Sequence, residues 1–182
     1  MLVRLLVCKK EAIRMRRMMV LLAASVWLFA GCEYIAPLTD EHSIAVDSSV
    51  LGLWELIPEE GKETKQDERM MILKYSETEY LIHYPAGEGG LYYRAYPIKI
   101  KDVSCVQLQV IGSEDGLPEK DETELFHVAS YRLVDGRLEI KTLNTDLVKD
   151  DLKTTNALRE AFIKHKDNKD LFKYPEVFKK AE

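Results

Sequence analysis

Four histidines and one cysteine in the body of the chain are the side chains best suited to acid–base, nucleophilic or metal chemistry. His42, His83, His127 and His165 lie far apart in sequence and lack the spacing of metal-ligand motifs. Cys105 and His127 would make a nucleophile–base dyad, but Cys105 alternates with apolar residues in "VSCVQLQV", as a buried and inert thiol does. The nucleophile elbow, the phosphate-binding glycine loop and the His-Glu-x-x-His motif are absent from the sequence. We therefore expect no catalytic residue, no metal site, no cofactor and no enzymatic activity.

Carboxylates concentrate in residues 113–124, "SEDGLPEKDETE", where a cation site would be conceivable. This segment lacks the ligand spacing of a calcium-binding loop, in which Asp or Asn residues alternate ahead of a glycine. A solvated loop between two strands is the expected structure.

Six of the nine tyrosines fall within residues 75–96, and they suggest a binding surface. Tyrosine offers a large apolar area with a polar tip, which suits recognition. The candidates for a ligand pocket or partner patch are Tyr84, Tyr92, Arg94 and Tyr96. The alternative is that these rings pair across neighbouring strands of one sheet.

The elements that must position these residues are predicted to be strands from Leu51 to Leu143. Short runs rich in β-branched and aromatic residues are separated by turn signals, and Asp135-Gly136 is the strongest hairpin signal among them. In residues 103–112, Val106, Leu108 and Val110 share one face, opposite Cys105 and Gln107. We predict a mainly β (α+β) fold: an antiparallel meander or barrel of seven to eight strands.

The tail is predicted to be helical. Leu158, Ala161, Phe162 and His165 have helical spacing, and Thr154 or Thr155 is a plausible N-cap. A second short helix is expected from Pro175, because proline suits the first helical position. These helices would cover an edge or an end of the barrel.

Gly52-Leu53-Trp54, at the first predicted strand, resembles the Gly-x-Trp motif of lipocalins. The resemblance implies an up-and-down barrel whose base is packed by Gly52 and Trp54, and which holds a small apolar ligand. It also implies a basic residue stacked on Trp54, for which Arg137 on the last strand is the candidate. An unrelated β-sandwich or barrel, with Trp54 as an ordinary core residue, remains the alternative.

The amino-terminal segment has the features of a secretory signal. Basic residues precede an apolar run from Met18 to Ala30, which as a helix would be about 20 Å long and too short for a bilayer core. The run ends in Leu28-Phe29-Ala30-Gly31-Cys32, which resembles the lipobox of bacterial lipoproteins. The resemblance implies cleavage before Cys32 and lipidation of Cys32, which would anchor the chain to a membrane. Met15 would begin a compact signal, so residues 1–14 are interpreted as an unused upstream start.

Three segments follow from this interpretation: a signal peptide over 1–31, a lipidated tether over 32–50 with one edge strand near 43–47, and a single domain over 51–182. Residues 1–31 contain six of the 26 basic and one of the 31 acidic residues, which leaves residues 32–182 with a formal charge of −10. Such an acidic surface repels phosphate backbones, so nucleic acid is not an expected partner.

The predicted location is the cell envelope, on a lipid anchor. For a Gram-negative cell, the resemblance to bacterial lipoproteins implies the periplasmic face of the outer membrane, because Glu33 and not Asp follows the cysteine. The expected function is binding of a small apolar ligand, and the alternative is an accessory protein that docks on an envelope complex.

Overall fold

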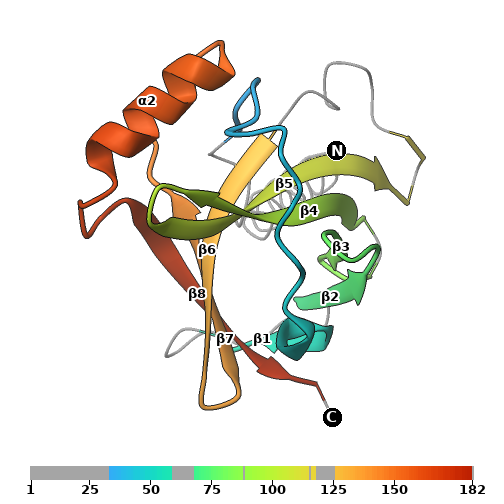
Figure 1. Ribbon diagram of the computed structural model, residues 1–182. Helices are drawn as coiled ribbons and strands as arrows, with labels where there is room; N and C mark the ends of the chain where they lie inside the picture. The colour runs from blue at the N-terminus through green and yellow to red at the C-terminus, as the bar shows by residue number, and fades with distance from the viewer. Residues whose placement is uncertain (1–32, 59–67, 88, 115, 118–125, 182) are drawn as a thin grey trace, which may run out of the picture. The chain divides into compact units, whose positions relative to one another are not determined.

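The computed structural model describes residues 33–58, 68–87, 89–114, 116–117 and 126–181 (Figure 1). They belong to one compact unit that spans Cys32–Glu182. The predicted signal peptide, Cys32 itself and most of the acidic segment 113–124 lie outside the described residues.

Eight antiparallel strands form a closed barrel in which each strand pairs with its neighbours in sequence, and β8 pairs with both β7 and β1. The predicted antiparallel barrel is therefore confirmed. The strands are β1 Gly52–Leu56, β2 Arg69–Lys74, β3 Tyr80–Tyr84, β4 Leu91–Ile100, β5 Val103–Ser113, β6 Phe126–Val134, β7 Arg137–Leu143 and β8 Phe172–Lys180. A short 3-10 helix, η1 (Ser48–Val50), precedes β1.

Two local signals fold as predicted. Asp135 and Gly136 join β6 to β7 with φ angles of 51° and 73°, the left-handed conformation that a tight hairpin turn requires. The helix α2 spans Thr155–His165, and the side chain of Thr154 caps it by accepting a hydrogen bond from Ala157 N at 3.2 Å. Leu158 and Phe162 are the buried residues of α2.

The expected second helix at Pro175 is wrong, because this segment is the strand β8. The register of β8 on β7 shifts between Ile140 and Thr142, and Tyr174 has a φ of 56°. Pro175 lies at this irregularity, where the hydrogen bonds between β7 and β8 are already interrupted, so a residue without an N–H removes little stabilisation there. Residues 43–47, the expected edge strand, are not part of any strand.

Two apolar clusters stabilise the fold, one on each face of the sheet. Alternation along β5 places Val106, Leu108 and Val110 in the lumen, while Cys105 belongs to the cluster outside the barrel. That outer cluster joins the barrel wall to α2 and to the N-terminal segment; it comprises Tyr34, Leu38, Tyr96, Ile98, Ile100, Cys105, Val128, Leu143, Val148, Leu158, Phe162 and Leu171. In Figure 1 the N-terminal segment crosses the outer face of β4 and β5 and ends at η1.

Trp54 is a buried residue of β1 that lies beside the 3-10 helix η1. Its ring is buried and its Nε1 donates to Val50 O at 2.8 Å. The cation over the ring is Lys180, with Nζ 5.0 Å from the ring centroid. It is not the expected Arg137, which lies opposite Lys179 in the register of β7 and β8. Gly52 has a φ of +127°, and a Cβ there would lie 3.0 Å from Cε of Lys180, so glycine suits this position for two reasons.

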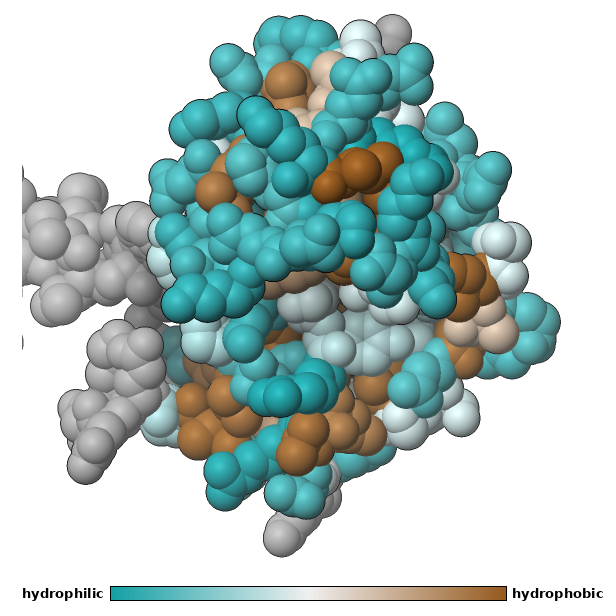
Figure 2. All heavy atoms as spheres, turned by 60° about the vertical axis from the view of Figure 1, so that its left-hand side comes forward, coloured by the Kyte–Doolittle hydropathy of each residue, from teal (hydrophilic) through white to brown (hydrophobic). Residues whose placement is uncertain are grey.

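The surface shown in Figure 2 is hydrophilic over most of its area, with apolar residues in separate groups. No helix within the described part of the chain has the length and apolar character needed to cross a membrane.

Candidate functional site

Large buried side chains point into the lumen of the barrel. The inner face carries large buried residues, and some of them meet between strands that are not neighbours. Tyr84 on β3 contacts the ring of Phe178 on β8 with centroids 6.1 Å apart, and Tyr93 on β4 contacts His127 on β6 at 6.0 Å. Burial raises the pKa of both tyrosines, so they remain neutral. An eight-stranded barrel is just wide enough to be filled in this way.

Outside the barrel, residues 34–47 form a segment that we call the strap. The strap crosses β4 and β5 and is held by Gln107, a fully buried residue of β5. The Gln107 Oε1 atom accepts hydrogen bonds from the backbone N–H groups of Leu38 at 2.6 Å and Thr39 at 3.3 Å. The Gln107 Nε2 atom donates to Thr39 O at 3.2 Å and to the hydroxyl of Tyr96. One amide therefore satisfies three backbone groups of the strap.

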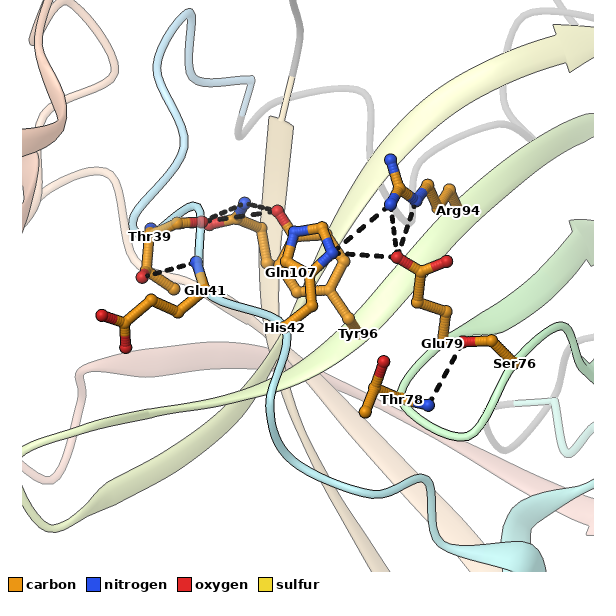
Figure 3. A network of polar contacts seen from close by, with 9 residues as sticks. All are labelled: Thr39, Glu41, His42, Ser76, Thr78, Glu79, Arg94, Tyr96 and Gln107. Carbon is orange, nitrogen blue, oxygen red and sulfur yellow. Dashed lines mark hydrogen bonds and ion pairs between the residues drawn. The ribbon is translucent and has the colours of Figure 1, made fainter.

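A polar network continues from the hydrogen bonds of Gln107 toward β3 (Figure 3). His42 of the strap stacks on Tyr96, with ring centroids 3.6 Å apart, and its Nδ1 lies 2.9 Å from Oε1 of Glu79. The same carboxylate accepts hydrogen bonds from Nε and Nη2 of Arg94, the former at 3.0 Å. Two side chains, one from the strap and one from β4, thus meet at a carboxylate from the β2–β3 turn.

The turn between β2 and β3 places Glu79 in this network. The backbone N–H groups of Tyr75 and Ser76 donate to the Glu79 carbonyl at 2.9 and 3.1 Å. Glu79 is 93% buried, since its relative exposure is 7%. The hydrogen bonds from Arg94, together with those from His42, hold the pKa of the Glu79 carboxyl below its usual value, although burial opposes the shift. Glu79 is therefore ionised at neutral pH and fixes the orientation of Arg94.

Beside this network lies an open cleft of about 380 Å³, lined by Tyr75, Tyr80, Leu81, Arg94 and Ile111. Its rim is apolar and exposed: Tyr75 is 67% and Ile111 37% accessible to solvent. The contacts of Arg94 with other described residues engage Nε and Nη2, and Figure 3 shows the third guanidinium nitrogen, Nη1, pointing away from Glu79. The cleft therefore combines apolar walls with one oriented cation that retains unused N–H donors.

The structure separates the four residues predicted as one pocket or patch. Tyr84 lies in the lumen, and Tyr96 is buried beneath the strap. Tyr92 stacks on His83 on the outer face, with centroids 4.2 Å apart. Arg94 alone among the four lines the cleft. The cross-strand stacking of Tyr92 on His83 matches the alternative that the rings pair within a sheet.

Sequence reasoning missed Leu81, Glu79, His42 and Gln107 as parts of this region. Leu81 pairs with Arg94 across β3 and β4, so the two side chains lie on the same face of the sheet. Cross-strand pairing of the two predicted strands is the sequence signal that could have found Leu81. His42, Glu79 and Gln107 carry no local signal, since each acts through a partner that is distant in sequence.

Within the described residues, no three His, Cys, Asp or Glu side chains are grouped so that they could hold a metal ion. Cys105 and His127 lie in different clusters, because Cys105 belongs to the outer core whereas His127 contacts Tyr93 in the lumen. Comparison with protein-family models, curated proteins and solved structures found no match to this chain.

Proposed function

We propose that this chain is a lipid-anchored protein of the cell envelope that docks on a partner protein through the cleft on its outer face. The supporting observation is the distribution of apolar surface. Aromatic side chains of the protein meet across the lumen, whereas Tyr75, Leu81 and Ile111 remain accessible around the cleft. Exposed apolar residues grouped around an oriented polar group are typical of an interaction site.

The chemistry of the cleft defines its occupant. An apolar side chain of the partner would fill the space between Leu81 and Ile111, and Tyr75 would add contact area at the rim. A carboxylate or carbonyl beside that side chain would accept hydrogen bonds from Arg94. Because Glu79 already balances the charge of Arg94, the gain comes from directed hydrogen bonds rather than from net charge.

The proposed anchor is the lipid on Cys32, which the lipobox-like ending of the leader supports. Two or more acyl chains on one residue give stable attachment to a membrane, whereas one chain alone is marginal. The outer membrane, on its periplasmic face, is the proposed location in a Gram-negative cell.

A small, largely apolar ligand in the same cleft is the second candidate. The volume of about 380 Å³ favours it, because this lies within the range of ligand pockets in proteins. This candidate places the ligand on the outer wall of the barrel. A lipocalin would instead hold its ligand in the lumen.

Site-specific photo-crosslinking in intact cells tests the proposal. A photoreactive residue is placed at Ile111 in the cleft and, as the matched control, at Val134, which is 46% exposed at the end of β6. We expect one protein adduct of defined mass at position 111, its loss when Arg94→Ala is added, and no such adduct at position 134. Equal adducts at both positions, or an adduct that is indifferent to Arg94→Ala, would refute docking at the cleft. A native mass spectrum of the purified protein with a bound small molecule that Arg94→Ala removes would support the second candidate instead.

A further inference from the structure

The strap is bonded to the barrel from its first residue onward. Tyr34 is fully buried, and its N–H and C=O form a two-way bridge with Phe126 at 2.8 and 2.7 Å. Its hydroxyl donates to Val148 O at 2.9 Å. Tyr34 is therefore fixed to the start of β6 and to the segment after β7.

Further contacts hold the strap along its length. Gln107 binds Leu38 and Thr39, as described above. Near the end of the strap, Val46 N donates to Glu77 O at 3.0 Å, and Asp47 N donates to the Tyr80 hydroxyl at 2.6 Å. The segment expected to be a tether over residues 32–50 is thus bound to the domain over most of its length.

With the proposed cleavage before Cys32, this binding would leave almost no free chain between the lipid and the barrel. Cys32 precedes Tyr34 by two residues, and two extended residues span at most about 7 Å. Glu33 is the single residue between the proposed lipid and the first docked residue. Ile35, next to Tyr34, is 42% exposed and offers an apolar side chain at the same place.

From this geometry we propose that the protein lies directly against the membrane surface, with the Tyr34–Phe126 end of the barrel turned to the lipid headgroups. The inference rests on the proposed lipidation of Cys32. The partner of this surface is the lipid bilayer that holds the acyl chains. The formal charge of −10 on residues 32–182 excludes attraction to anionic headgroups as the cause, so the acyl chains and the short link hold the contact.

The length of strand β6 sets the distance between two probe positions that can test this orientation. It begins at Phe126, beside Tyr34, and ends at Val134. Eight residues of strand correspond to about 26 Å at roughly 3.3 Å per residue. A probe at Ile35 therefore lies near the headgroups, and a probe at Val134 lies much farther from Tyr34.

The experiment uses the full lipidated protein with a fluorophore on a single introduced cysteine, Ile35→Cys or, as the control, Val134→Cys. Cys105 does not interfere, because it is buried and burial raises the pKa of its thiol to about 12. Each protein is reconstituted into phosphatidylcholine vesicles in which a fraction of the lipids carries a quencher on the headgroup. We expect several-fold stronger quenching at position 35 than at position 134.

A spacer variant separates orientation from mere attachment. Sixteen Gly/Ser residues inserted between Glu33 and Tyr34 add a root-mean-square length of about 22 Å. We expect quenching at position 35 to fall toward the value at position 134 while the protein still floats with the vesicles. Equal quenching at the two positions without the spacer, or no effect of the spacer, would overturn the orientation and leave the anchor intact. If mass spectrometry finds Cys32 without a lipid and the protein does not float, the anchor and the orientation are both overturned.

Discussion

Replacement of Gln107 by leucine should be among the most destabilising single changes in the described part of this protein. Leucine has nearly the size of glutamine and can occupy the same buried space, so the change removes hydrogen bonds with little change in packing. It leaves the N–H groups of Leu38 and Thr39 without the acceptor that Gln107 provides, whereas the C=O of Thr39 still accepts from the Tyr96 hydroxyl at 3.4 Å.

The magnitude follows from the two routes open to the mutant. If the strap stays in place, each buried backbone group without a partner costs about 1–3 kcal/mol, or about 2–6 kcal/mol for the N–H groups of Leu38 and Thr39. If the strap lifts, the fully buried Tyr34 and Leu38 become exposed, at about 1.5–3 kcal/mol each. The two routes give losses of about 2–6 and about 3–6 kcal/mol, which are large fractions of the 5–15 kcal/mol typical of a domain.

Urea unfolding of the purified domain, Cys32–Glu182, measures this loss. The control is Ser104→Ala, an exposed position on the same strand, which should change the free energy of unfolding by less than about 0.5 kcal/mol. Limited proteolysis within the strap distinguishes the two routes, because a lifted strap is cleaved faster. If the Gln107→Leu protein is as stable as the Ser104→Ala protein, the hydrogen bonds of Gln107 do not hold the strap and the reasoning is refuted.

Three other predictions concern single side chains. Because the hydrogen bonds from Arg94 lower the folded-state pKa of Glu79 below its ordinary 4.5, its stabilisation is present above that value and lost as the pH falls through the lower folded pKa. The stability difference between wild type and Glu79→Gln should therefore be greatest near neutral pH and shrink below about pH 4.5 in pH-dependent urea unfolding. Lys180→Met keeps the stem but removes both the cation over Trp54 and the hydrogen bond from Nζ to Leu51 O, and should lower the free energy of unfolding by about 1–2.5 kcal/mol, as urea unfolding measures. Cys105 should resist thiol reagents at pH 7.5 in the folded protein and react fully in urea; rapid labelling of the native protein would contradict its burial.

The sequence predicted the elements whose signals are local. The Asp135-Gly136 turn, the cap at Thr154 and the spacing of Leu158 and Phe162 each involve residues within one or two turns of chain, and each folds as expected. The alternation along β5 also assigned its side chains correctly to two faces. It could not reveal that both faces are buried, one because it points into the lumen and the other because α2 and the strap cover it.

Elements that depend on distant partners escaped prediction. Pro175 is a good first residue of a helix, yet closure of the barrel requires a strand there, and β8 gains hydrogen bonds on both of its edges. Lys180 stands over Trp54 for the same reason, since only closure brings β8 next to β1. Of the candidate site, the sequence found Arg94, because its charge among tyrosines was visible locally, whereas the role of Glu79 depends on the fold.

The strap joins the two functional features proposed for this protein. His42 belongs to the strap and binds Glu79, and Glu79 holds Arg94 at the wall of the cleft. An occupant that draws Arg94 toward itself competes with Glu79, and so changes the contact that Glu79 makes with the strap. By linkage, any change in strap docking caused by the occupant must be matched by an equal effect of strap docking on the affinity of the cleft. Because the strap begins two residues after the proposed lipid anchor, the proposed position of the barrel on the membrane and the state of the cleft would be parts of a single equilibrium.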